Sequence, residues 1–211
     1  ATVSVTLPTE GAERSALSAI TGNLTDEFSG VQRAVLRLSY LDAGTSYYWQ
    51  GSGSGWTSVY STSVVSQPAD SIGAPSSAWT YADVPTPWVT GRVYRIDAWG
   101  EDMAANQTVS TSTVNWLADL STGTAVVTDP AANGGFRSVG TPLTVLTGTA
   151  VEAPVHSWAK IDEVQVRIQA EDANLYWNGS TWTASANTWI SSAGWNAGSV
   201  SWAVAQATCP A

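Results

Sequence analysis

The stretch Val31-Gln-Arg-Ala-Val-Leu-Arg-Leu38 returns later in the chain as Ile161-Asp-Glu-Val-Gln-Val-Arg-Ile168, a shift of 130 positions. In both copies aliphatic residues alternate with other residues, and a period of two is typical of a β-strand with one buried face. Arg37 and Arg167 fall on the opposite side of their strands from the aliphatic residues. We therefore expect the same strand to occur twice, with its arginine facing solvent or a sheet edge.

Further matches flank this pair in the same order along the chain. They are Ile20-Thr-Gly22 with Leu146-Thr-Gly148, Tyr48-Trp-Gln-Gly51 with Tyr176-Trp-Asn-Gly179, Trp56 with Trp182, and Trp79 with Trp202. Ordered matches whose spacing drifts slowly indicate a duplicated unit with insertions and deletions in its loops. The repeat predicts a first domain at residues 1–117, a short polar linker at 118–123 and a second domain at 124–211.

Local patterns add detail to the predicted strands. The stretch Gly91-Arg-Val-Tyr-Arg-Ile-Asp-Ala98 places Tyr94, Ile96 and Ala98 on one face of a strand. The dipeptide Asn178-Gly179 favours a two-residue hairpin, because a type I′ turn needs positive φ angles. In such a hairpin Leu175 would face Trp182.

The composition supports a secreted β-protein. A chain of 211 residues suits two sandwiches of roughly 100 residues each. Charged residues are only 12% of the chain, and 18 Gly and 9 Pro interrupt it too often for long helices. A net charge of −9 with a single Lys argues against nucleic acid as a partner. No apolar run approaches the ~18 residues of a membrane span, and the single Cys209 allows no internal disulfide.

Together these motifs resemble the bacterial immunoglobulin-like repeats of large surface proteins. The resemblance rests on Ile20-Thr-Gly22, the Tyr48-Trp-Gln-Gly51 hairpin and the closing Ala98-Trp-Gly-Glu-Asp-Met-Ala-Ala-Asn106. It implies an all-β fold of two tandem immunoglobulin-like antiparallel β-sandwiches, located outside the cell or on its surface. In that family the last motif usually has Gly before the final Asn, whereas this chain has Ala105.

The second copy lacks counterparts of the last strands of the first. Judged from residues 84–114 of the first copy, roughly 30 residues have no match. Either the natural chain continues, or a neighbouring molecule supplies a strand by β-augmentation. The candidate donor segment is the alternating stretch at the start of a neighbour, formed by Thr2, Val3, Ser4, Val5, Thr6 and Leu7.

The sequence shows no recognisable catalytic motif. His156 is the only histidine, and no Gly-x-Ser-x-Gly motif occurs in a strand-to-helix context. We therefore predict no catalytic residues and no enzyme activity. One oxygen-rich set could bind calcium at a domain junction, and otherwise no cofactor is expected. The set comprises Asp97, Glu101, Asp102 and Asn106; the alternative, which we favour, is that Asp102 and Asn106 cap a turn.

Twelve tryptophans are the most unusual feature of the composition. Those that recur in both copies are predicted to pack in the core or across hairpins. A coplanar row of exposed tryptophans could instead bind a carbohydrate, and the candidates are the non-repeated Trp88, Trp116, Trp158, Trp189 and Trp195. Three Asn-x-Ser/Thr sequences match the glycan acceptor pattern, at Asn23, Asn106 and Asn178.

The sequence thus favours a non-enzymatic structural or adhesive repeat. It would act as a spacer in a surface protein or as a subunit of an extracellular filament, with copies of itself or neighbouring repeats as partners. The alternative is a carbohydrate-binding β-sandwich that uses exposed tryptophans.

Overall fold

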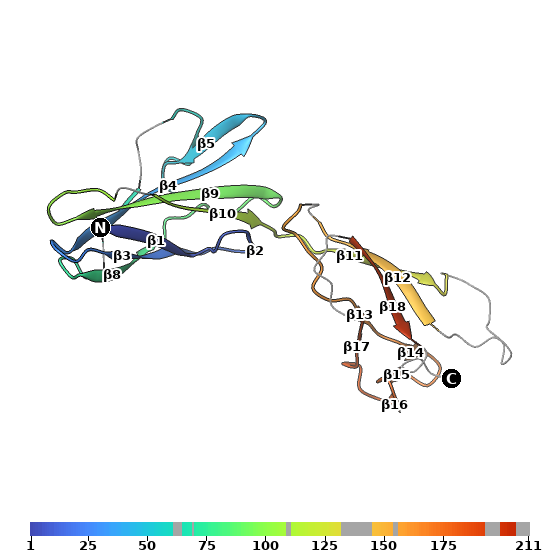
Figure 1. Ribbon diagram of the computed structural model, residues 1–211. Coiled ribbons are helices and arrows are strands. Elements are labelled where there is room, and N and C mark those ends of the chain that lie inside the picture. The colour runs from blue at the N-terminus through green and yellow to red at the C-terminus, as the bar shows by residue number, and fades with distance from the viewer. Residues whose placement is uncertain are drawn as a thin grey trace. The chain divides into compact units, whose positions relative to one another are not determined.

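A computed structural model describes residues 1–60, 65–68, 70–108, 111–131, 145–153, 156–192 and 199–205 (Figure 1). All regular structure in these ranges is β-strand, which confirms the all-β prediction. The described residues include no helix that is long and apolar enough to cross a membrane. The chain divides into two compact units, unit 1 from Ala1 to Ser121 and unit 2 from Thr122 to Ala211.

Unit 1 is a sandwich of two sheets, which Figure 1 shows one above the other. The smaller sheet has the order β1 (Thr2–Leu7), β3 (Ile20–Thr25), β8 (Ser76–Tyr81). The larger sheet has the order β2 (Ala12–Arg14), β10 (Ser112–Ala118), β9 (Arg92–Asp102), β4 (Val31–Asp42), β5 (Thr45–Trp49), β6 (Trp56–Thr57), and β7 (Val65–Pro68) also pairs with β4. Neighbouring strands are antiparallel except β2, which runs parallel to β10. The chain therefore changes sheets between β1 and β2.

The core of unit 1 lies between its two sheets. The period-two prediction is confirmed: Leu36 and Leu38 of β4, like Tyr94 and Ile96 of β9, are buried in one hydrophobic cluster. The smaller sheet contributes its buried residues to the same cluster, including Trp79. Alternation along each strand thus directs one side chain in two into the space between the sheets.

Unit 2 has shorter strands and a smaller core. One sheet has the order β11 (Thr124–Asp129), β12 (Val145–Val151), β18 (Ser199–Ala205). The other strands form two small groups: β13 (Gln165–Val166) with β17 (Ile190–Ser191), and β14 (Gln169–Ala170) with β15 (Leu175–Trp177) and β16 (Trp182–Thr183). Ile161, Val164 and Trp202 are among the residues buried in its core.

Several strand pairs have the same register in the two units. The pairs, given for unit 1 and then unit 2, are Val5↔Gly22 and Val127↔Gly148, Gly22↔Trp79 and Gly148↔Trp202, Tyr48↔Thr57 and Tyr176↔Thr183, and Trp49↔Trp56 and Trp177↔Trp182. An irregularity in the first pairing follows Val5 in β1 and Val127 in β11. The positions that match in sequence therefore occupy matching positions in the sheets.

The predicted two-residue hairpin at Asn178-Gly179 is wrong. Trp177, not Leu175, faces Trp182, and the turn between them contains four residues. The Asn178 Oδ1 atom accepts hydrogen bonds from the backbone N–H groups of Ser180 (2.9 Å) and Thr181 (2.7 Å). The asparagine side chain thus stabilises a longer turn than the dipeptide alone indicates.

The structure also places part of the predicted linker in unit 1. Strand β10 continues to Ala118, beyond the predicted domain end at residue 117. Asp119 is buried, and its backbone N–H donates to the carbonyl of Arg14 (2.9 Å). Its carboxylate accepts a hydrogen bond from the N–H of Ser121 (2.9 Å). Residues 118–121 are therefore held by the sandwich.

Candidate functional site

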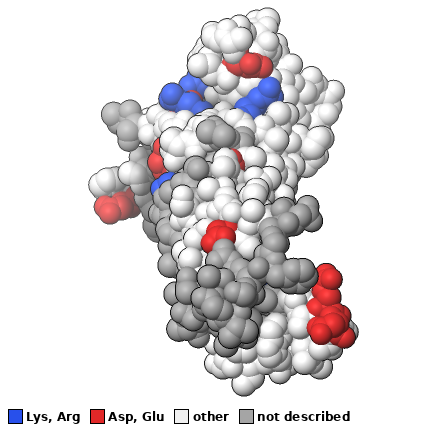
Figure 2. Space-filling model, turned by 90° about the vertical axis from the view of Figure 1, so that its right-hand side faces the viewer, with Lys and Arg blue, Asp and Glu red and all other residues white. Residues whose placement is uncertain are grey.

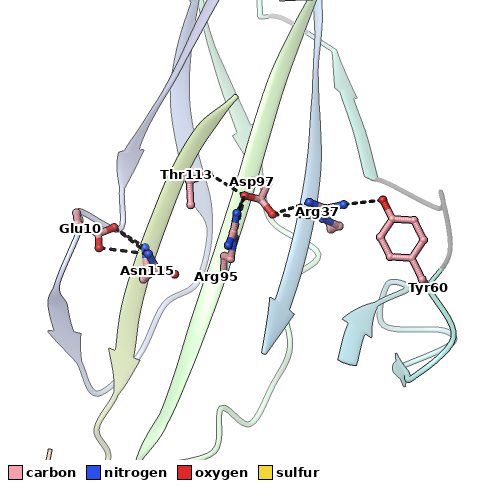
Figure 3. A network of polar contacts seen from close by, with 7 residues as sticks. All are labelled: Glu10, Arg37, Tyr60, Arg95, Asp97, Thr113 and Asn115. Carbon is pink, nitrogen blue, oxygen red and sulfur yellow. Dashed lines mark hydrogen bonds and ion pairs between the residues drawn. The ribbon is translucent and has the colours of Figure 1, made fainter. Parts of the chain in front are cut away.

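The outer face of the larger sheet of unit 1 carries a polar network centred on Asp97 of β9 (Figure 3). Arg37 of β4 and Thr113 of β10 stand directly opposite Asp97 in the strand registers. The Asp97 Oδ2 atom accepts from Nη2 of Arg37 (2.9 Å), and Oδ1 accepts from Nη2 of Arg95 (2.8 Å) and from the Thr113 hydroxyl (2.8 Å). The carboxylate therefore ties three strands together.

Further polar contacts lie on either side of Asp97 across the strands of the sheet. Arg37 Nη1 donates to the Tyr60 hydroxyl (2.9 Å), and its guanidinium lies 5.6 Å from the centre of the Tyr60 ring. On the far side, as Figure 3 shows, Glu10 accepts hydrogen bonds from the backbone N–H (2.6 Å) and the side chain of Asn115. Glu10, Asn115, Arg37 and Tyr60 are thus engaged with one another or with Asp97.

The charge state of Asp97 follows from its partners. Burial raises the pKa of its carboxyl, but hydrogen bonds from Arg95, Arg37 and Thr113 outweigh this and hold the pKa below its usual value. The carboxylate is therefore ionised at neutral pH while its side chain is only 3% exposed. With both oxygens occupied by donors, its geometry fits a cross-strand support rather than a general base.

The structure does not bring the predicted calcium set together. Asp97 is engaged as described, and Glu101 accepts from Nε (3.1 Å) and Nη2 (2.8 Å) of Arg33. Asp102 accepts from the N–H groups of Ala104 (2.9 Å) and Asn106 (2.8 Å), so the favoured turn-capping role is what the structure shows. The described residues contain no group of three or more His, Cys, Asp or Glu that could hold a metal ion.

Two of the five proposed carbohydrate-binding tryptophans lie in the core, so their prediction as exposed residues is wrong. Trp88 is 5% and Trp116 0% exposed, and both pack against the ring of Tyr94 at centroid distances of 4.7 and 5.4 Å. Trp88 also donates its ring N–H to the carbonyl of Leu17 (2.9 Å). Both residues therefore pack in the core of the sandwich and are not exposed for ligand binding.

The other three tryptophans belong to unit 2. Trp158 is half-buried beside His156, with 5.2 Å between the ring centres. Trp189 is 50% exposed, and Trp195 lies outside the described residues. The guanidinium of Arg167 lies 5.1 Å from the ring centre of Trp189 and 5.4 Å from that of Tyr176. Among the four candidates that the structure describes, Trp189 is thus the most exposed residue.

The remaining predicted sites are the candidate donor strand and the candidate glycan acceptors. Thr2–Leu7 forms β1 and pairs with β3 of its own unit, with Val3, Val5 and Leu7 against the core. In this single chain the segment completes its own sandwich, and its donation to a neighbour stays a prediction. Asn23, Asn106 and Asn178 are all exposed, while Cys209 lies outside the described residues.

The charged residues do not form a broad basic surface on the face that Figure 2 shows, where they occur as small separate groups. A scan against models of protein families finds no family that matches this chain. A comparison with curated proteins finds no relative either. The function must therefore be argued from the geometry of the two units.

Proposed function

We propose that this chain is a non-enzymatic structural segment of an extracellular or cell-surface protein. In this proposal the two units are copies of one immunoglobulin-like sandwich that act as spacers or as parts of a filament. The strand order of unit 1 supports it. The strands β1, β3 and β8 face β10, β9, β4 and β5, as the A, B, E and G, F, C, C′ strands do in immunoglobulin-like domains.

The observation that carries the proposal is a glycine–tryptophan contact that occurs in both units. A Cβ atom added to Gly22 would lie 2.2 Å from Cζ2 of Trp79, and one added to Gly148 would lie 2.2 Å from Cζ2 of Trp202. Each indole therefore covers the backbone of the strand beside it. Because only glycine permits this approach, its occurrence at the same register in both units favours duplication of one scaffold.

The chemistry of the charged groups also favours a structural role. In the described residues the acidic cluster around β9 is engaged with Arg33, Arg37, Arg95 and backbone donors. Such networks across neighbouring strands hold a sheet together, and they engage these carboxylates with donors of the protein itself. A repeat that bears load or acts as a spacer needs this rigidity and needs no reactive group.

Force spectroscopy tests the structural role. The whole chain is held between two handles of known mechanical behaviour and extended. Unit 1 should resist as one body and release about 40 nm of chain, since its 121 residues extend by roughly 3.3–3.6 Å each. Extension without a discrete step of this length would contradict a load-bearing sandwich.

The exposed ring of Trp189 supports carbohydrate binding as a second candidate function. An indole face beside a guanidinium and polar side chains can stack on a sugar ring. Titration of the chain with soluble polysaccharides should then change tryptophan fluorescence, and Trp189→Ala should abolish the change. Trp158→Ala is the matched control. A fluorescence change that survives in Trp189→Ala, or the absence of any change, would exclude this surface.

A further inference from the structure

One side of the β13–β14 segment in unit 2 reproduces the pairing of β4 in unit 1. Leu36 pairs with Val65 of β7, and its counterpart Val166 pairs with Ile190 of β17. Tyr40 pairs with Tyr47 of β5, and its counterpart Ala170 pairs with Leu175 of β15. The segment 165–170 therefore corresponds to the β4 strand in both sequence and register.

The opposite side of the same segment differs between the units. In unit 1 this side of β4 is paired with β9 from Val31 to Tyr40. In unit 2 no described strand pairs with that side of β13 or β14. Backbone N–H and C=O groups along a free edge form a template for another strand.

The inward-facing side chains of unit 2 show the same difference. Leu36 and Leu38 are 1% and 3% exposed under the cover of β9, whereas their counterparts Val166 and Ile168 are only half-buried. Val127, the counterpart of the half-buried Val5, is 47% exposed. An aliphatic strip that is covered in unit 1 is thus open in unit 2, and covering it would be favourable.

A cavity marks one end of the open strip. It has a volume of about 440 Å³, and its lining includes Ala125, Ala150, Ile161 and Val164. In unit 1 the position of Val164 is taken by Ala34, which pairs with Gly100 of β9. A Cβ atom on Gly100 would lie 2.4 Å from Leu24, the counterpart of Ala150. The cavity of unit 2 therefore lies where the end of β9 packs in unit 1.

The charge of Arg167 indicates which side chain a strand bound at this edge should carry. In unit 1 Arg37 stands opposite Asp97 of β9 and forms an ion pair of 2.9 Å with it. Its counterpart Arg167 contacts the rings of Tyr176 and Trp189, and no carboxylate of the described residues forms an ion pair with it. An aspartate or glutamate opposite Arg167 would complete the same arrangement.

From the edge that no described strand covers, the open strip and the arginine that no described carboxylate pairs with, we infer that unit 2 binds an extended strand from outside the described residues. The bound strand runs antiparallel to residues 165–170, directs small and aliphatic side chains inward at alternate positions, and places a carboxylate opposite Arg167. The strand β9 of unit 1 is the pattern for this ligand. The inference rests on the proposed duplication of one scaffold, because that duplication defines the position of the strand.

A synthetic peptide with the sequence of Arg92–Asp102 tests this inference on the intact chain. Fluorescence anisotropy of the labelled peptide should show saturable binding, and the amides of residues 165–170 should exchange more slowly with solvent in its presence. The amides of β4 should not change. Replacing the aspartate that corresponds to Asp97 in the peptide by arginine, or Arg167 by Glu in the chain, should each weaken binding at least about tenfold.

The combined substitution distinguishes a specific pair from general attraction. The Arg167→Glu chain should regain affinity for the peptide that carries arginine instead of aspartate. Arg33→Glu makes the same change of net charge in unit 1 and should show no such recovery. The inference would be overturned if the control variant regained affinity for the peptide that carries arginine. Equal binding by all variants, or no binding at all, would also overturn it.

Two further results would also overturn it and identify the alternative. If the chain associates with itself at rising concentration and excludes the peptide, a second copy covers this edge. If the peptide does not bind while unit 1 still unfolds as one body under force, this inference fails and the proposed structural role stands. If the force step is lost while the peptide still binds, the proposed structural role fails and the strand-binding inference stands.

Discussion

The contact between Gly22 and Trp79 shows how a single residue position constrains the sandwich. An added Cβ would lie 2.0 Å from the carbonyl oxygen of Ser4 as well as 2.2 Å from the indole. Neither the backbone of β1 nor a fully buried indole can move away cheaply. We therefore expect Gly22→Ala to destabilise unit 1 by about 3 kcal/mol, as overpacking of a core does.

Urea denaturation of the whole chain measures this effect. Gly53→Ala is the matched control, because a Cβ at Gly53 would meet nothing within 4 Å. The control should change the free energy of unfolding by less than about 0.5 kcal/mol. Equal effects of the two substitutions would contradict the close approach.

Ala105 occupies a conformation that favours glycine. Its φ angle is +64°, in the left-handed region that favours glycine. This conformation costs an L-residue roughly 1–2 kcal/mol, whereas glycine loses about 0.4–1 kcal/mol through the entropy of the unfolded chain. Ala105→Gly should therefore raise the free energy of unfolding of unit 1 by about 0.5–1 kcal/mol. The control Ala104→Gly should lower it, and a gain in both variants would refute this explanation.

At the scale of elements, the Asp97 network links β4, β9 and β10. Because the pKa of Asp97 is lower in the folded than in the unfolded chain, its stabilising effect is present above about pH 4 and is lost as the pH falls further. Asp97→Asn should cost about 1.5–3 kcal/mol at pH 7, since it removes charged hydrogen bonds. The difference from the wild type should narrow steadily below pH 4.

Urea midpoints of both proteins at several pH values provide the measurement. Asp172→Asn, at an exposed turn of unit 2, should leave the unfolding of unit 1 unchanged at every pH. A difference between wild type and Asp97→Asn that is independent of pH would mean that the carboxylate is not the source of the stability.

The same elements show how far sequence reasoning reaches. The alternation in β4 and β9 predicts their buried faces because period two follows directly from strand geometry. The failure at Trp88 and Trp116 has a logical cause. Both lie in the part of unit 1 that has no counterpart in the second copy, so the lack of a match carried no information about exposure. The pairing of Arg37 with Asp97 depends on strand register, which neither strand specifies by itself.

At the scale of the whole molecule, each unit has its own core. The buried cluster of unit 1 runs from Leu17 to Ala118, and that of unit 2 from Leu146 to Val204. The residues bonded to Asp97 all belong to unit 1 as well. A domain with its own core and its own polar network should fold without its neighbour in the chain.

Residues 1–121 produced alone should therefore unfold in one cooperative transition. Their free energy of unfolding should lie within about 0.5 kcal/mol of the value for unit 1 in the whole chain, because the division removes no residue of that core. A fragment that ends at residue 111 is the control, since it lacks β10 and with it the buried Trp116, Leu117 and Ala118. The control should not fold. Much lower stability of 1–121 would mean that unit 2 supports unit 1 through contacts that the two separate cores do not explain.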